Sequence, residues 1–273
     1  MSPTTSRPRT CVVTGGALGI GGAVSRRLAA DGDHVLLVDL DEEAARRAAS
    51  DIATAGGRCT VIVGDITREE TVRSLGAAAD DAGGADVVVN NVGDFRPAKA
   101  VFVKSEPAQW QRLHELNLWH VFTVTHRLLP AMIERGAGAI VNVSTVEAFR
   151  GIPGHAVYSA YNAGVSAFTK SLAVELGPSG IRVNAIAPDL ADTPQTPAEA
   201  MLAGRDPALL RSWLPLGRFG VPDDYAEVVA FLASDAARFV TGHTIPVDGG
   251  TLAASGWYGR AGRRGWTNLP DHA

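Results

Sequence analysis

Two hydroxyls and a phenol near the middle of the chain are the side chains best suited to chemistry. Ser144 and Thr145 follow an apolar–polar alternation over residues 141–143, which predicts that they stand at the end of a buried strand. Tyr158 and Asn162 follow a loop and lie four residues apart, so they share one face of an expected helix. A strand-end hydroxyl that faces a phenol on the next helix can exchange a proton with a substrate oxygen. An ordinary buried strand and helix would show the same pattern, so the interpretation depends on the elements around them.

The first of these elements is a glycine-rich turn between an expected strand and an expected helix. The apolar strand at residues 11–13 leads into Thr-Gly-Gly-Ala-Leu-Gly-Ile-Gly at residues 14–21, and a helix follows. Glycine allows the backbone to approach a pyrophosphate closely, and the helix N-terminus offers it free N–H groups. The turn therefore predicts dinucleotide binding through Gly15, Gly19 and Ile20, although such a turn alone also occurs without a ligand.

The next expected strand, residues 35–38, ends in Asp39, about 20 residues beyond the glycine turn. A carboxylate at this position can accept hydrogen bonds from the adenosine ribose hydroxyls and would repel a 2′-phosphate. Leu18 and Leu40 supply no cation to bind such a phosphate. These residues favour NAD(H) over NADP(H). The alternative role for Asp39 is to cap a helix expected over residues 42–53, although Asp41 is better placed for that.

Two further strands also end in polar groups. The strand at residues 60–63 is followed by Asp65 and Ile66, and the strand at residues 86–89 is followed by Asn91 and Gly93. Asp65 could contact the adenine amino group or cap a helix expected over residues 67–82. Because ligands of open α/β sheets bind at the carboxyl ends of the strands, four such polar ends in succession indicate one binding site.

The second half of the chain supplies the expected walls of the site. A long helix is expected over residues 107–134, and Asn117 in its interior is mildly costly unless its amide has a partner. The strand at residues 181–186 leads to a proline-rich loop that could order over a cofactor. An amphipathic helix over residues 201–214, a helix over residues 223–233 and a last strand over residues 241–247 follow. The expected pocket walls are largely apolar and comprise Phe95, Phe102, Phe149, Leu190 and Trp213.

Length and composition restrict the class of protein. The alternation of strands and helices continues unbroken from residue 11 to residue 247, so the 273 residues are expected to form a single domain with a core of about 8–252 and a tail at 253–273. A net charge of −4 gives no reason to expect binding to nucleic acid or to an anionic membrane. The tail mixes cations and aromatics, which indicates a subunit contact or the edge of a lid, with disorder as the alternative.

The cellular location is predicted from what the sequence lacks. Cys11 and Cys59 show neither disulfide nor metal spacing, which suits a reducing cytosol. The first ten residues are polar and do not resemble a signal peptide, and no apolar stretch approaches the roughly 18 residues of a membrane span. We expect a cytoplasmic protein whose partner is a small-molecule substrate, with no metal site.

Taken together, these motifs resemble the short-chain dehydrogenase/reductase family. The match runs from the glycine turn through Asn117 and the 141–164 stretch to the Thr-Gly and Asp-Gly-Gly motifs near residues 241–250, and so covers about residues 8–252. The resemblance implies an α/β fold with a single Rossmann-type, doubly wound parallel sheet of seven strands in the order 3-2-1-4-5-6-7, flanked by helices. It also implies a nicotinamide cofactor and a homotetramer, with a homodimer as the alternative.

The resemblance also implies site residues, with one departure. The family tetrad is asparagine, serine, tyrosine and lysine, and the matching positions hold Asn117, Thr145, Tyr158 and Asn162. Threonine keeps the hydroxyl, but asparagine replaces the lysine. The implied cofactor contacts are Gly15, Gly19, Ile20, Asp39, Asp65, Ile66, Asn91, Gly93, Tyr158, Asn162 and Pro188.

The missing lysine matters because, in the family mechanism, its ammonium binds the nicotinamide ribose and lowers the pKa of the tyrosine. A charge about 4 Å away is worth ~4 kcal/mol at an effective dielectric constant of 20, or about three pKa units. Without it, about one part in a thousand of Tyr158 would be phenolate at pH 7. Alcohol oxidation should then suffer more than carbonyl reduction. Asn162 can still hydrogen-bond the ribose, and a cation could come from Arg150, His155 or the tail arginines.

Three functions remain open on the sequence alone. The first is an NAD(H)-dependent oxidoreductase that interconverts a secondary alcohol and a ketone by hydride transfer. The second is a cofactor-binding protein with little redox activity that serves as a scaffold or regulator. The third is an enzyme of the same fold that catalyses a non-redox isomerisation or dehydration.

Overall fold

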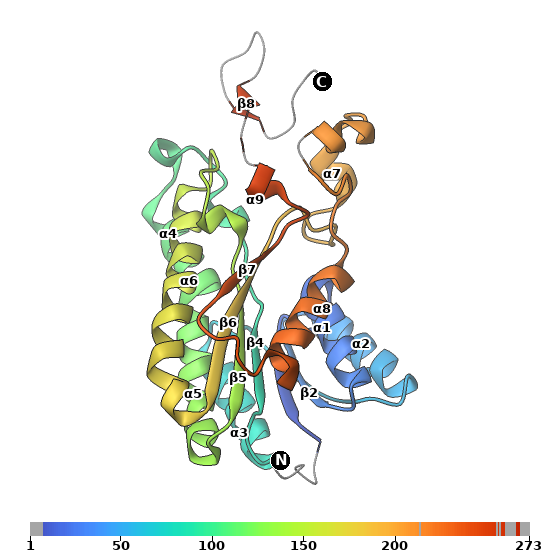
Figure 1. Cartoon of the computed structure of the whole chain (residues 1–273), viewed down its shortest axis with the longest axis vertical. Helices are drawn as coiled ribbons and strands as arrows, with labels where there is room; N and C mark the ends of the chain where they lie inside the picture. The colour runs from blue at the N-terminus through green and yellow to red at the C-terminus, as the bar shows by residue number, and fades with distance from the viewer. Residues whose placement is uncertain (1–7, 213, 255, 257, 260–265, 268–273) are drawn as a thin grey trace.

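A parallel β-sheet forms the centre of the molecule (Figure 1). The structure is a computed structural model that describes residues 8–212, 214–254, 256, 258–259 and 266–267. Seven strands pair in the order β3-β2-β1-β4-β5-β6-β7, and every neighbouring pair is parallel. This confirms the order that the resemblance implies. The strands are β1 (Thr10–Thr14), β2 (His34–Asp39), β3 (Arg58–Val63), β4 (Val87–Asn90), β5 (Gly138–Val143), β6 (Ile181–Pro188) and β7 (Thr244–Val247).

The central strands are apolar throughout because helices cover both faces of the sheet. In β1, Val12 and Val13 are both fully buried but point into different clusters of the core. Val13 packs with Leu28 and Val229 on one face, and Val12 packs with Leu75 and Met132 on the other. Successive side chains of a strand alternate between faces, so one short strand contributes to both halves of the core.

The helices form a layer on each side of the sheet (Figure 1). One layer contains α1 (Gly19–Ala30), α2 (Glu42–Thr54) and α8 (Pro222–Ala233). The other contains α3 (Glu69–Asp81), α4 (Pro107–His114), α5 (His120–Arg135) and α6 (Ala156–Leu176). The shorter elements are η1 (Arg96–Ala98), η2 (Phe102–Lys104), η4 (Val146–Ala148), η5 (Gly177–Ser179), η7 (Asp235–Ala237), α9 (Thr251–Ala254) and the antiparallel pair β8 (Tyr258–Gly259) and β9 (Trp266–Thr267).

The helix expected over residues 107–134 is interrupted by a π-helical segment, η3 (Glu115–Trp119). Asn117 lies in this segment, and its amide has the partners that the sequence analysis required. Its Nδ2 donates to the carbonyl oxygens of Asp94 at 2.8 Å and Leu113 at 2.9 Å, and its Oδ1 accepts from the Asp94 N–H at 3.0 Å. Single π turns in α-helices are frequent at functional sites. The continuous apolar spacing of the helix gave no sign of the interruption.

The single helix expected over residues 201–214 is wrong. The chain forms a short helix α7 (Ala198–Leu202) and a 3₁₀ segment η6 (Pro207–Ser212) instead. Ala203 and Gly204 separate them in left-handed backbone conformations, with φ of 50° and 77°. A glycine in this conformation commonly ends a helix, and Pro207 cannot continue one in its interior.

Two other expectations cannot be compared with the structure in full. Trp213, expected in the pocket wall, lies outside the described residues. So do most of the tail residues, including Trp257, Arg260, Arg263 and Arg264. Among the described residues, no helix has both the length and the apolar character needed to cross a membrane.

Candidate active site

A cavity of about 750 Å³ opens at the carboxyl ends of the strands. The glycine turn, the ends of β4, β5 and β6, and the start of α6 all contribute to its lining, as the strand-end argument predicts. The predicted site residues that line it are Gly15, Gly19, Ile20, Asn91, Gly93, Asn117, Thr145, Tyr158, Asn162 and Pro188. Three predicted residues are not among its lining, namely Asp39, Asp65 and Ile66.

The glycine turn forms a cradle that side chains would fill. A Cβ added at Gly21 would lie 2.0 Å from the Gly15 carbonyl oxygen and 2.5 Å from Nδ2 of Asn91. Gly15 and Gly19 have φ of +62° and +54°, a region that favours glycine. The N-cap of α1, Leu18, makes no side-chain capping bond, so the free N–H groups of the first turn remain available to an anion. This geometry fits the pyrophosphate of a dinucleotide.

Asp39 supports the glycine turn from the neighbouring strand. Its carboxylate accepts hydrogen bonds from the N–H of Ala17 at 3.0 Å and of Asp41 at 3.1 Å. Asp41, not Asp39, caps α2, because its side chain accepts from the Ala44 N–H at 2.9 Å. The capping alternative for Asp39 is therefore wrong. The carboxylate lies beside the glycine turn.

Asp65 and Ile66 occupy the turn before α3. Asp65 accepts from the N–H and the hydroxyl of Thr67 at 2.9 and 2.7 Å, and Arg112 lies 3.3 Å away. Burial raises the pKa of Asp65, but the bonds from Thr67 and the charge of Arg112 outweigh burial and lower the pKa overall. Ile66 is 3% exposed and packs in the core, so only its backbone can face a ligand.

The ends of β1 and β4 are tied together across the sheet. Nδ2 of Asn91 donates to the carbonyl oxygens of Thr14 at 3.0 Å and Gly15 at 3.2 Å. The proline-rich segment also reaches this edge, because Nε2 of Gln195 donates to the Gly93 carbonyl at 3.1 Å. The segment thus lies across the cavity, in the position expected of a loop that covers a cofactor.

Tyr158 is a half-buried phenol in the cavity wall. Its pKa is raised above the ordinary value, first by burial and then by the charge of Glu147. Asp94 and Asp189 add to this effect, and only a hydrogen bond with Thr145 opposes it. The phenol is therefore protonated at neutral pH and suited to donating a proton.

Asn162 is 3% exposed and turned back onto its own helix. Its Nδ2 donates to the Tyr158 backbone carbonyl at 3.1 Å. Its own backbone carbonyl accepts from the Ser144 hydroxyl at 3.0 Å. Ser144 thus joins strand to helix. The neighbouring Thr145 hydroxyl donates to the Pro188 carbonyl at 3.4 Å and accepts from the Glu147 N–H at 3.3 Å.

Arg150 does not serve as the missing cation for Tyr158, because it is engaged elsewhere. Its guanidinium forms an ion pair with Asp189 at 2.6 Å, and both side chains are less than 10% exposed. Thr251 also donates to the Asp189 carboxylate. Burial raises the pKa of Asp189 to about 6, although Arg150 and Thr251 oppose the shift.

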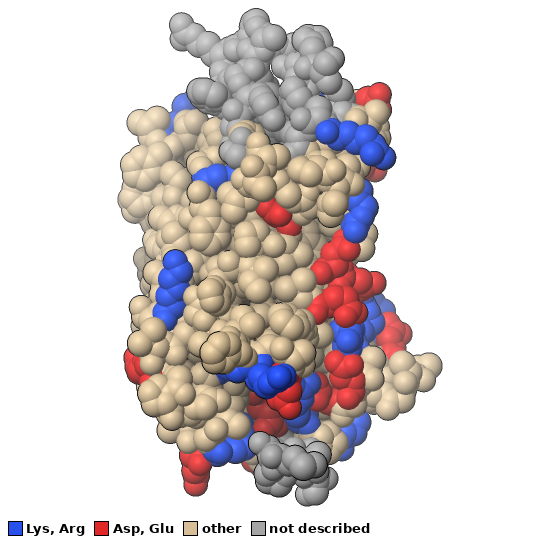
Figure 2. Space-filling view, viewed as in Figure 1, with Lys and Arg blue, Asp and Glu red and all other residues tan. Residues whose placement is uncertain are grey.

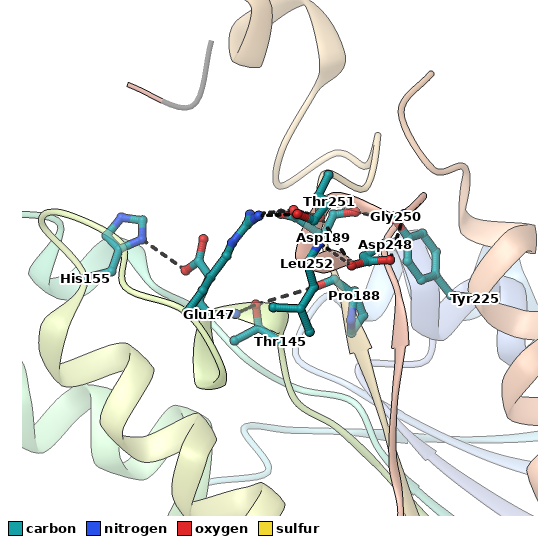
Figure 3. A network of polar contacts seen from close by, with 11 residues as sticks. Thr145, Glu147, His155, Pro188, Asp189, Tyr225, Asp248, Gly250, Thr251 and Leu252 are labelled. Atoms are coloured by element: carbon teal, nitrogen blue, oxygen red, sulfur yellow. Dashed lines mark hydrogen bonds and ion pairs between the residues drawn. The ribbon is translucent and has the colours of Figure 1, made fainter. Parts of the chain in front are cut away.

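His155 lies beside Tyr158 in the cavity wall. Its Nδ1 is 3.4 Å from Oε2 of Glu147, and its ring centroid is 6.0 Å from that of Tyr158 (Figure 3 shows the first of these contacts). The ring centroid of Phe95 lies 5.0 Å from that of His155. Nζ of Lys99 lies over the Phe95 ring, 5.6 Å from its centroid. The sequence analysis did not identify Glu147 or Lys99. Their position in loops beside the strand ends was the only available signal.

Comparison with known proteins gives consistent matches over nearly the whole chain. The family model described as Enoyl-(Acyl carrier protein) reductase matches residues 15–251. The cis-4-hydroxycyclohexanecarboxylate dehydrogenase of Sinomonas cyclohexanicum is 42% identical over 250 residues, which are 90% of this chain and 97% of the relative. The 3-oxoacyl-(acyl-carrier-protein) reductase FabG of Thermotoga maritima is 39% identical over 245 residues, 89% of this chain and 98% of the relative.

A solved structure supports the same assignment. A variant of actinorhodin polyketide ketoreductase with NADPH superposes with a TM-score of 0.83 at 33% identity, covering 91% of this chain and 99% of the other. The sheet order, the glycine cradle and these matches agree with one another. This chain is an oxidoreductase that belongs to the short-chain dehydrogenase/reductase family.

Proposed function

We propose that this protein interconverts a secondary alcohol and a ketone with NAD(H), using an altered tetrad of Asn117, Thr145, Tyr158 and Asn162. The observation that carries the proposal is the shared cavity, in which Tyr158 and Thr145 open onto the same space as the glycine cradle. A nicotinamide held there would supply or accept the hydride at the substrate carbon.

The residues of this chain favour carbonyl reduction at neutral pH. Tyr158 remains a protonated phenol and can donate a hydrogen bond to the carbonyl oxygen, while the Thr145 hydroxyl helps to hold that oxygen in place. Asn117 keeps the backbone of Asp94 at the cavity wall through two hydrogen bonds. We expect ketone reduction to be faster than alcohol oxidation at pH 7, and initial rates in both directions measure this.

The preference for NAD(H) rests on the residues around Asp39. The carboxylate lies beside the glycine turn, and the exposed side chains that flank the site, Leu18 and Leu40, are apolar. Fluorescence titration with NADH and NADPH tests the preference directly, with NADH expected to bind at least about tenfold more tightly because a 2′-phosphate meets a carboxylate without a cation. Equal or tighter binding of NADPH would refute this assignment.

The residues of the cavity wall indicate which substrates to test first. Lys99 and Phe95 offer a cation and a ring there, and the Sinomonas relative is named for a cyclic alcohol that carries a carboxylate. Cyclic hydroxy acids and keto acids therefore belong in the first substrate panel, next to uncharged ketones. Turnover that is abolished in Tyr158→Phe supports the redox reaction. Full activity of that variant would favour the non-redox alternative, and a panel without turnover would favour the scaffold.

We also propose that the protein is a cytoplasmic homotetramer or homodimer. Apolar side chains are exposed on α5, α6 and the adjoining η3, among them Val174 at 81%, Trp119 at 46% and Ile133 at 45%. Figure 2 shows charged side chains gathered mainly over α1, α2 and α8, with few over the opposite side. Light scattering on the purified protein measures the assembly, and a monomer at micromolar concentration would contradict it.

A further inference from the structure

His155 and Glu147 form a side-chain pair in the cavity wall that lies outside the tetrad. Glu147 belongs to η4, directly after β5, and His155 immediately precedes α6. Their side chains are only 14% and 11% exposed, and both line the cavity. The pair therefore joins the two elements that carry Thr145 and Tyr158.

The contacts of the imidazole leave one nitrogen for chemistry. Nδ1 faces the Glu147 carboxylate at 3.4 Å, which favours a proton on Nδ1 and a lone pair on Nε2. Within the described part of the chain, Nε2 forms no hydrogen bond with the protein. The Phe95 ring at 5.0 Å and the Tyr158 ring at 6.0 Å, 76° from the imidazole plane, hold the imidazole beside the phenol.

The surroundings of Tyr158 mean that alcohol oxidation needs a proton acceptor other than the phenol. Oxidation of an alcohol requires a proton acceptor, and the phenol is a poor one because burial and carboxylates raise its pKa. The lysine that would lower this pKa is absent, and Arg150 is committed to Asp189. His155 is a neighbouring titratable group in the same cavity wall.

We propose that Nε2 of His155 accepts and returns the substrate proton, and that Glu147 is the residue that positions it. The assignment rests on the proposed alcohol–ketone reaction. In oxidation, the substrate C–H bond would break, and its hydrogen would pass with both bonding electrons to an oxidised nicotinamide held at the glycine turn. The O–H bond breaks with its proton passing to Nε2, and the C=O bond forms. In reduction, the imidazolium returns the proton, while neutral Tyr158 and Thr145 hold the oxygen.

Several other charges face this region and contribute to its pH dependence. Glu147 comes from the η4 segment, and Lys99 and the Arg96–Asp94 pair come from the loop after β4. The buried Arg150–Asp189 pair lies beyond Glu147. Substitutions of His155 and Glu147 leave the other charged groups unchanged, so a changed pH profile reports on the His155–Glu147 pair.

The first experiment removes the imidazole. His155→Asn should lower kcat for alcohol oxidation about 100-fold, within the range of general acid–base catalysis. His155→Ala should regain activity when imidazole is added, in proportion to the unprotonated form. The matched control is His126→Asn, an exposed histidine on α5 outside the cavity lining, which should leave the rates unchanged. NADH affinity should be the same in all three variants.

The second experiment tests the role of Glu147 without relying on turnover. In ¹⁵N NMR of the wild-type protein, His155 should carry its proton on Nδ1 when neutral. Glu147→Gln replaces the anionic acceptor of Nδ1–H by a neutral amide, so it should raise the share of the Nε2-protonated tautomer and lower the rate of oxidation. Glu147→Asp should restore part of both effects.

The outcomes separate this assignment from the proposed function. Normal wild-type turnover together with an unchanged rate and pH profile in His155→Asn would overturn the role of His155 alone. A neutral imidazole with its proton on Nε2, or failure of imidazole to rescue His155→Ala, would count against it equally. Absence of wild-type turnover would overturn the proposed function and this proton transfer with it.

Discussion

The charges around Tyr158 are opposite in sign to the lysine ammonium that the family resemblance implies beside the tyrosine. An ammonium four residues further along the helix would stabilise the phenolate, whereas here Asn162 bonds with the backbone of Tyr158 and carries no charge. The strongest electrostatic influences on the phenol come from Glu147, Asp94 and Asp189, and each carboxylate favours the protonated form. At the residue scale, the site is therefore built around a phenol that stays protonated.

Restoring a cation next to Tyr158 should reverse this preference. We expect Asn162→Lys to raise the rate of alcohol oxidation at pH 7 at least about tenfold and to move its pH profile downward, because a charge ~4 Å away lowers the tyrosine pKa by one to three units. Steady-state kinetics between pH 6 and 10 measure both effects. Asn162→Gln, with similar bulk and no charge, should change neither.

An unchanged profile in Asn162→Lys would show that another group already handles the proton. Combination with His155→Asn then identifies that group. If His155 is the proton acceptor, the double variant should recover oxidation through the phenolate.

At the scale of elements, the cofactor cradle depends on three segments that approach one another closely. The glycine turn meets the end of β4 through Asn91 and the side of β2 through Asp39. The backbone at Gly21 comes so near to Gly15 that no side chain fits between them. These contacts hold the N-terminus of α1 at the edge of the cavity.

Filling the cradle should abolish cofactor binding. Gly21→Ala places a methyl group 2.0 Å from the Gly15 carbonyl oxygen, so the turn must move, at a cost of about 1–3 kcal/mol in unfolding free energy. We expect NADH affinity to fall at least about tenfold in fluorescence titration. Gly151→Ala is the matched control, because nothing lies within 4 Å of its added Cβ. Equal affinity of the two variants would mean that the cofactor does not use this turn.

At the scale of the whole molecule, Arg150, Asp189 and Thr251 join three segments that are far apart in sequence (Figure 3). They come from the loop before α6, the end of β6 and the start of α9. Tyr225 of α8 adds a hydrogen bond to the Asp189 carbonyl at 2.8 Å. The network therefore ties the cavity-lining Asp189 to the loop before α6, to α8 and to α9.

The pKa of Asp189 gives this network a pH dependence with a definite sign. Burial raises the pKa from 3.8 to about 6 in the folded protein, so the folded state binds more protons than the unfolded state between these values. The contribution of Asp189 to stability is therefore complete below pH 4 and is lost as the pH rises through 6. Urea unfolding of wild type and Asp189→Asn at pH 4.5 and 7 should show wild type losing stability relative to the variant, by an amount on the order of 1 kcal/mol.

If wild type instead gained stability relative to Asp189→Asn between pH 4.5 and 7, the ion pair with Arg150 would outweigh the burial of the Asp189 carboxylate. Asp192, in the neighbouring loop, offers a control, because its carboxylate caps the exposed N–H of Ala198. Asp192→Asn should leave the difference between the two pH values unchanged.

The family resemblance, and not a local pattern, supplied the strand order and the lysine position that Asn162 occupies. The sequence by itself determined the glycine turn and the polar strand ends. These features depend on local periodicity and spacing, which the backbone geometry of strands and helices translates directly into structure. It also required a partner for the Asn117 amide, and the structure supplies three hydrogen bonds.

Only the tertiary structure decided which of the loop side chains meet. Glu147 with His155, and Arg150 with Asp189, are pairs between irregular segments whose paths no local pattern specifies. The π-helical turn and the break at Ala203 and Gly204 likewise depend on long-range contacts and turn chemistry. The raised pKa of Tyr158 follows from burial and from three carboxylates brought together by folding, because charge interactions act through space and not along the chain.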